Sequence, residues 1–124
     1  MSTHCGIAVK TEKGYETIYC HHDGYPEYMW EMLTENYGNF FRASGLVELG
    51  DASSISKRMV PSRDSGHSFD NPEDDVCIFY GRDRGEENVG PNYYDKKTLL
   101  DMYYYAYVFE YDCWKYYRNG RKIY

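Results

Sequence analysis

Two arginines in segment 81–86 are the side chains best suited to bind a phosphate group. Arg82 and Arg84 stand on either side of Asp83, and a glycine lies next to each arginine. A guanidinium group binds phosphate through two parallel hydrogen bonds. Alternate residues of an extended loop point to one side, so we expect both arginines to reach one pyrophosphate, with Asp83 directed away. The alternative is a solvated surface loop in which Asp83 and Glu86 neutralise the arginines.

A second candidate site lies at 20–28, where a strand is expected to pass into a helix. The run Cys-His-His-Asp at 20–23 offers three kinds of metal ligand. Neighbouring residues on a strand point to opposite faces, so at most two could reach one ion, and we predict no metal site. A helix N-terminus offers free N–H groups to an anion. His21 and Tyr25 are therefore candidate ligand contacts, with purely structural roles as the alternative.

Charge and motifs narrow the function classes. The net charge of -6 argues against a surface that coats DNA or RNA, because such surfaces gather lysine and arginine. A small anionic ligand needs only local basic groups, and Lys57, Arg58 and Arg63 form a second such group. The sequence contains no nucleophile elbow, Walker loop or zinc-protease motif. We predict a binding protein with no catalytic residue and no cofactor.

Apolar alternation predicts an N-terminal hairpin over 4–22 with half-buried strands. A four-residue turn that ends at Gly14 sets the register, so that Cys5 faces Cys20. We expect both cysteines to remain thiols, because the chain shows no signal peptide and disulfides are rare in the cytosol. The row expected to face the core is Cys5, Ile7, Val9, Ile18 and Cys20.

Two helices are expected over 26–49. Pro26 suits the first position of a helix, and Gly38 is a natural stop for it. The second and shorter helix ends at Gly50. It is expected to offer Phe40, Leu46 and Leu49 to the core.

The rest of the chain is expected to alternate between irregular segments and strands. Residues 51–75 have no sustained period and predict a long loop, with an extended piece near 56–60. A buried strand is expected at 76–80, helical turns at 94–102, and a β-hairpin region at 103–124. The fold class is α+β: one domain over 1–124, with an antiparallel sheet and terminal hairpins packed against one or two short helices.

Sixteen tyrosines in 124 residues exceed what one small core readily encloses. Since tyrosine joins a flat apolar ring to a polar tip, we expect a homo-oligomer whose contact is the C-terminal hairpin. No apolar run approaches the roughly 20 residues of a membrane span, so we expect a cytoplasmic protein. The tyrosines concerned are Tyr103, Tyr104, Tyr105, Tyr107 and Tyr117.

Four segments resemble a group of small phage proteins similar to the Thoeris anti-defence sponges. These sponges bind cyclic ADP-ribose signals made by bacterial TIR-domain enzymes and withhold them from the host effector. The resemblance implies an oligomeric α+β domain in the host bacterial cytoplasm, with a nucleotide pocket, no cofactor and no turnover. The segments are Ser-Thr-His-Cys at 2–5, the block with Tyr-Cys-His-His-Asp-Gly-Tyr-Pro at 18–28, Leu-Gly-Asp with Ser-Ser-Ile at 49–55, and 81–86.

Side-chain chemistry then assigns ligand contacts. Arg82 and Arg84 would hold phosphate, Asn92 would meet a ribose or base edge, and Phe79 or Tyr93 would stack on adenine. The main alternative function is inhibition of a host or defence protein through direct contact with the acidic, tyrosine-rich surface. Hydrolysis of a nucleotide signal is the third.

Overall fold

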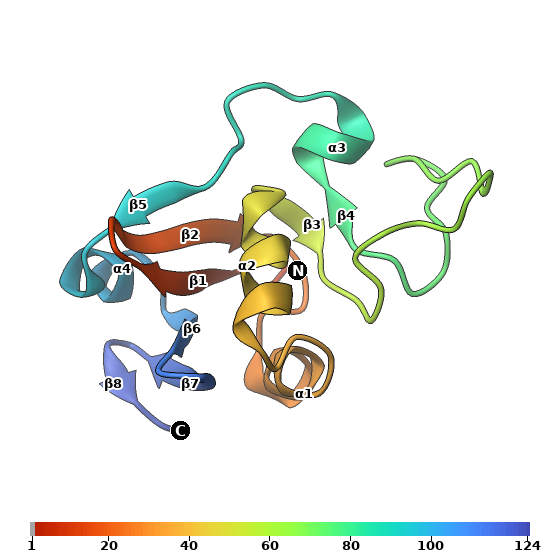
Figure 1. Ribbon diagram of the computed structural model, residues 1–124. Helices are drawn as coiled ribbons and strands as arrows, with labels where there is room; N and C mark the ends of the chain where they lie inside the picture. Colours follow the sequence, from red (N-terminus) through yellow and green to blue (C-terminus); the bar gives the residue numbers. More distant parts are fainter. Residues whose placement is uncertain (1) are drawn as a thin grey trace.

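A mixed eight-stranded sheet organises the protein, as the computed structural model of residues 2–124 shows (Figure 1). The strand order is β4-β3-β2-β1-β6-β7-β8, and β5 pairs with β2. The α+β class is confirmed. The prediction of a purely antiparallel sheet is wrong, because β1 pairs in parallel with β6, and β2 pairs in parallel with β3. The strands are Cys5–Thr11 (β1), Gly14–Cys20 (β2), Ala52–Ser54 (β3), Ile78–Phe79 (β4), Asn92–Tyr94 (β5), Tyr105–Glu110 (β6), Cys113–Arg118 (β7) and Arg121–Lys122 (β8).

The hairpin of β1 and β2 has the predicted register. Cys5 lies opposite Cys20, and Ile7 lies opposite Ile18. All four side chains are buried in one apolar cluster, and both cysteines are free thiols. Burial, together with the neighbouring Cys20, raises the pKa of Cys5 well above its usual value. The local alternation therefore predicted this part of the core correctly.

Both faces of the central strands are covered, although the alternation predicts half-buried strands. Helices α1 (Pro26–Asn36) and α2 (Phe40–Glu48) pack on the face that carries Ile7, while α4 (Lys96–Met102) packs on the other face. The β1 residues that face α4, such as Gly6 and Ala8, are small. A side chain at Gly6 would collide with the ring of Tyr103. Strands that are covered on both faces are typical of parallel pairing.

The two N-terminal helices lie close to their predicted ranges. The side chain of Asn39 accepts a hydrogen bond from the Arg42 amide at 2.8 Å and caps α2. Leu46 is buried as predicted, but the expected core position of Phe40 is wrong, since Phe40 is 52% exposed. Its ring lies in the first turn of α2, beside the β1–β2 turn and Tyr93. No helix among residues 2–124 combines the length and apolar character that crossing a bilayer requires.

The segment between α2 and β5 departs most from prediction. The segment begins with the short strand β3. The extended piece that was expected at 56–60 is reduced to a single β-bridge between Arg58 and Val76. The expected strand at 76–80 shrinks to β4. Helix α3 (Tyr80–Arg84) replaces the predicted loop, because the Asp83 carboxylate accepts the amide of Phe79 at 2.8 Å and closes the first turn.

The C-terminal hairpin forms as predicted. Strands β6 and β7 pair throughout, and their turn residues Tyr111 and Asp112 have φ values of 52° and 64°. Two successive left-handed residues form the tight turn that suits the twist of a hairpin. Asn119 and Gly120 repeat this arrangement, with φ values of 51° and 78°, and lead into β8.

The sheet encloses tyrosines that the sequence assigns to an oligomer contact. Tyr107 is fully buried and Tyr117 is 6% exposed. The Tyr107 hydroxyl donates a hydrogen bond to the Gly24 carbonyl at 2.8 Å, which satisfies its polar tip inside the core. Tyr104, at 54% exposed, remains on the surface. Oligomerisation through this hairpin stays a prediction.

Candidate functional site

Arg82 and Arg84 do not lie on an extended loop, so the geometry behind the pyrophosphate hypothesis is wrong. Both belong to α3, where positions two apart point in different directions. Arg84 forms an ion pair with Glu86 at 2.5 Å and lies over the rings of Phe69 and Tyr80. Arg82 pairs with Asp83 at 2.8 Å. Acidic neighbours neutralise both arginines, as the alternative interpretation predicted.

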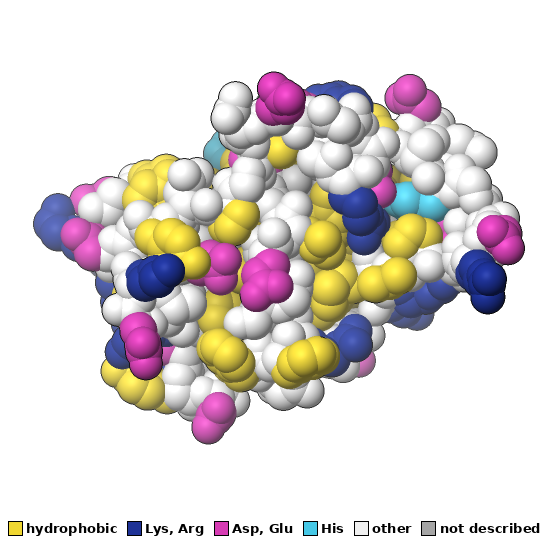
Figure 2. Space-filling view, turned by 45° about the horizontal axis from the view of Figure 1, so that its top comes forward, with side chains coloured by type: hydrophobic (Ala, Val, Ile, Leu, Met, Phe, Trp, Pro, Cys, Tyr) yellow, Lys and Arg dark blue, Asp and Glu magenta, His cyan; other side chains and the backbone are white. Residues whose placement is uncertain are grey.

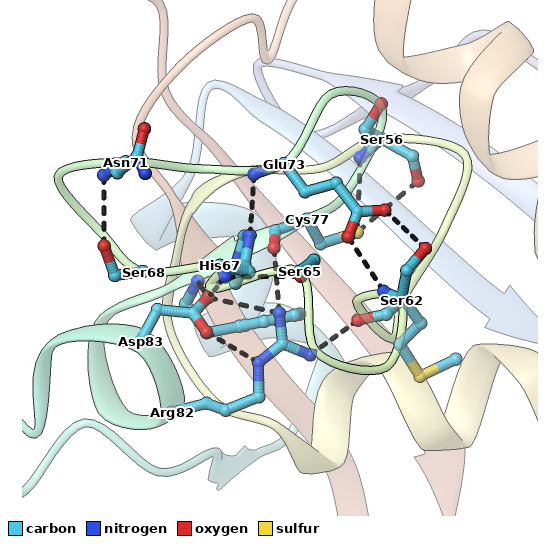
Figure 3. Close-up of polar contacts among 12 residues, drawn as sticks. Ser56, Ser62, Ser65, His67, Ser68, Asn71, Glu73, Cys77, Arg82 and Asp83 are labelled. Atoms are coloured by element: carbon cyan, nitrogen blue, oxygen red, sulfur yellow. Dashed lines mark hydrogen bonds and ion pairs between the residues drawn. The ribbon is translucent and has the colours of Figure 1, made fainter.

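Arg82 and Asp83 instead anchor the long segment that precedes β4 (Figure 3). The Arg82 guanidinium donates to the carbonyls of Met59 at 2.5 Å and of Cys77 at 2.9 Å. Asp83 is only 4% exposed. Burial raises its pKa, but hydrogen bonds from Arg82 and the Phe79 amide, together with the nearby His67, outweigh this effect and leave the pKa of Asp83 below its usual value. This side-chain cluster positions backbone, which is a structural role.

His67 completes this cluster. Its Nε2 lies 3.2 Å from the Asp83 carboxylate, in an electrostatic contact whose geometry does not make a directed hydrogen bond. Its Nδ1 accepts the Glu73 amide at 3.0 Å. The Glu73 carboxylate in turn accepts the hydroxyl and amide of Ser62, both at 2.8 Å. Polar contacts therefore hold residues 61–75, none of which is buried, while Ile55 and Cys77 at the two ends of the long segment lie in the apolar core.

The other predicted contacts are dispersed. Phe79 is fully buried, so neither face of its ring is open to a base, and its proposed stacking role is wrong. His21 is held by Tyr19, whose hydroxyl lies 2.6 Å from Nδ1. The Gly24 amide, part of the predicted anion seat, donates to the Thr3 carbonyl at 2.8 Å. Tyr25 is 36% exposed on the surface beside α1.

Tyr93 is the predicted residue that the structure places in an open concave surface. A depression of about 910 Å³ runs across the exposed side of α2, from the β2–β5 edge to segment 57–60. A smaller neighbouring hollow of about 680 Å³ shares Phe40 and Tyr93 with it and reaches Lys10 and Lys13. Asn92 is exposed on the same strand as Tyr93. We call the larger hollow the α2 depression. Its lining includes Glu16, Phe40, Phe41, Glu48, Lys57 and Tyr93.

Exposed aromatic rings are the first property of the α2 depression. Phe40 is 52%, Phe41 86% and Tyr93 47% exposed. Figure 2 shows hydrophobic patches on this face, with acidic groups between them and Lys and Arg around them. An exposed apolar patch rimmed by polar residues is typical of a binding surface.

Glu16 supplies the negative charge at the floor of the depression. It lies on β2 directly opposite Tyr93 on β5 and is only 8% exposed. Burial raises the pKa of the Glu16 carboxyl, and the nearby Glu48 raises it further, while a hydrogen bond with Tyr93 partly opposes both effects. In the described chain, no ion pair joins Glu16 to a basic residue.

Basic groups lie at one end of the depression and in the smaller neighbouring hollow. Lys57 and Arg58 line one end of the depression, and Arg58 forms an ion pair with Glu73 at 2.6 Å. Lys10 and Lys13 line the neighbouring hollow. Within residues 2–124, Lys13 and Lys57 make no ion pair. These two ammonium groups are available to a ligand.

The sequence held two signals for this site. Lys57 and Arg58 stood out as a second basic group, and Tyr93 as a stacking ring. The roles of Glu16 and Phe40 were missed, since one looks like a solvent-facing strand residue and the other like a core residue. Comparison of the chain with family models, with curated proteins and with solved structures finds no match.

Proposed function

We propose that the protein binds a nucleotide signal of the cyclic ADP-ribose type in the α2 depression and withholds it, which would block bacterial TIR-based (Thoeris) immunity. The observation that carries this proposal is the combination of exposed rings at Tyr93 and Phe40 with the free ammonium group of Lys57 along one hollow. The resemblance to the anti-defence sponges supports the same ligand class. The site thus moves from α3 to α2, while the predicted function is kept.

The lining residues divide the recognition of a nucleotide between them. Any base can stack on an aromatic ring, and each stacking contact contributes about 1–3 kcal/mol to the binding free energy. Tyr93 or Phe40 offers such a ring. Lysine binds phosphate as a point charge, and Lys57 and Lys13 lie at opposite ends of the combined hollow. A volume of about 910 Å³ falls in the size range of small-molecule sites.

Sequestration needs affinity and no chemistry. The proposal assigns no catalytic residue, cofactor or metal to the protein, and the bound nucleotide leaves unchanged. The protein would therefore act in proportion to its concentration, because each site removes one molecule of signal.

A second candidate function is direct contact with a host or defence protein. Phe41 and Val60 line the depression and are 86% and 67% exposed. Large exposed apolar side chains with a charged rim are also typical of protein interfaces. In that case the depression would be one part of a wider contact surface, and no nucleotide would be taken up.

Equilibrium dialysis against cyclic ADP-ribose isomers tests the proposal. The protein is expected to take up ligand and, after heat denaturation, to return it intact on chromatography. Tyr93→Ala should weaken binding about ten- to a hundredfold, which is the loss of one stacking contact. Tyr104→Ala, which removes an exposed tyrosine outside the depression, is the matched control and should bind normally. Recovery of cleaved products would identify a hydrolase, and absence of uptake would favour the protein-contact function.

A further inference from the structure

We infer that Glu16, assisted by Glu48, selects a purine base that carries an exocyclic amino group. This inference rests on the proposed function and adds the part of the ligand that the floor of the α2 depression recognises. It starts from an unusual feature of the hollow, which is a carboxylate placed among aromatic rings where an anionic nucleotide is expected to bind.

The position of Glu16 aims its carboxylate into the hollow. On β2 it follows the same alternation as Ile18 and Cys20, so it lies on the core-facing side of the strand, beneath α2. Tyr93 stands directly opposite on β5, where side chains on one face of neighbouring strands touch. A base stacked on Tyr93 would therefore present its edge to Glu16.

The charge at this point calls for a hydrogen-bond donor. Glu16 is 8% exposed, lines the hollow, and forms no ion pair among the described residues. Burial and Glu48 raise its pKa, and a hydrogen bond with Tyr93 opposes this shift only in part, so the carboxylate, which has no cation beside it in the described chain, keeps acceptor capacity for a ligand. A buried acceptor gains most from a donor that the ligand brings.

The chemistry distinguishes purines by the group at C6. The C6 amino group of adenine donates a hydrogen bond, which an ionised carboxylate accepts. The C6 carbonyl of hypoxanthine is itself an acceptor, and where N1 is substituted and carries no proton, this carbonyl would face the carboxylate without a proton between them. The basic groups at the ends of the combined hollow bind phosphate in both compounds, so they add affinity without this discrimination.

Glu48 strengthens the selection from the opposite wall. It is exposed on α2 and lines the same hollow, so it can approach the same edge of the base. Because its side chain lies on the helix surface, its replacement should leave the fold intact. This makes Glu48 the second position at which the inference can be tested if a change at the buried Glu16 disturbs packing.

The test is isothermal titration calorimetry of the full chain with the cyclic ADP-ribose isomer whose ring closes through N1 and with its hypoxanthine counterpart, in which N1 carries no proton and only the group at C6 differs. The wild type should prefer the adenine compound at least tenfold. Glu16→Gln should reduce this preference to threefold or less, mainly by improving binding of the hypoxanthine compound, because an amide can donate to the carbonyl. Glu48→Gln should reduce it partly. Glu87→Gln, at an exposed position outside the lining, should leave the preference unchanged. Circular dichroism shows that each variant is folded.

The possible results separate the inference from the proposed function. Equal binding of both compounds by the wild type, or a preference that survives in both Glu16→Gln and Glu48→Gln, overturns the selection by carboxylates while leaving nucleotide binding in place. A failure of every compound to bind overturns the proposed function and the inference with it.

Discussion

The sheet core and segment 61–75 are stabilised by different kinds of interaction. The core strands bury apolar side chains such as Ile7 and Ile18, whose positions follow a period of two along the chain. No residue of segment 61–75 is buried, and the segment is held by single polar contacts such as those of His67 with Asp83 and of Ser62 with Glu73. Apolar burial is shared among many similar contacts, so the loss of one side chain leaves the others in place. A polar cluster depends on each of its members.

The largest effect is expected from Ile7→Ala in the sheet core. Ile7 is fully buried between the helices and the sheet, and loss of such a side chain costs about 2–5 kcal/mol because a cavity remains. The free energy of unfolding in urea, followed by circular dichroism, measures this loss. Val60→Ala, at a 67% exposed position, is the control and should change it by less than about 0.5 kcal/mol. Equal effects at both positions would contradict the assigned core.

A smaller and local effect is expected from Asp83→Ala. The change leaves the Phe79 amide without its acceptor and removes the ionic partner of Arg82, at a cost of about 1–3 kcal/mol. Hydrogen exchange should rise in segment 61–75 while β1 and β6 stay protected, because polar contacts hold this segment and apolar burial holds the strands. Glu86→Gln removes only the surface ion-pair partner of Arg84 and serves as the control. Uniform loss of protection across the sheet would show that the two regions unfold together.

Acid should loosen segment 61–75 through Glu73. Hydrogen bonds from the hydroxyl and amide of Ser62 lower the pKa of Glu73 from 4.5 to about 2. A carboxyl group whose pKa is lower in the folded state stabilises the fold fully above its unfolded pKa, and this contribution disappears as pH falls through the folded pKa. The wild type should therefore have a higher melting temperature than Glu73→Gln at pH 5, and the two melting temperatures should converge near pH 2. A difference that is independent of pH would contradict this role.

The smallest effect is expected from Arg84→Ala. The side chain is 48% exposed and pairs with Glu86 at the surface, where an ion pair contributes at most about 1 kcal/mol. Its removal should lower stability slightly and leave nucleotide affinity unchanged. Loss of affinity by tenfold or more in a folded variant would return the phosphate site to α3 and count against the α2 depression.

The candidate site was only partly predictable. Tyr93 and the basic pair at Lys57 and Arg58 could be chosen for their chemistry, because stacking and phosphate binding need those residue types wherever they lie. Arg82 looks the same in sequence, but in the structure its guanidinium binds backbone carbonyls of the chain itself. Residue type gives the possible partners of a side chain. The fold decides which partner is within reach.

The sequence by itself determined the two hairpins and the helices α1 and α2, since alternation, caps and turn residues act over a few neighbouring positions. These signals were enough to predict the register of Cys5 against Cys20 and the tight turn at Tyr111. Only the tertiary structure decided that β1 pairs in parallel with β6, and that Glu16 lies beside Tyr93 in the lining of the α2 depression. These outcomes depend on contacts between residues far apart in the chain, whose free energies no local pattern encodes.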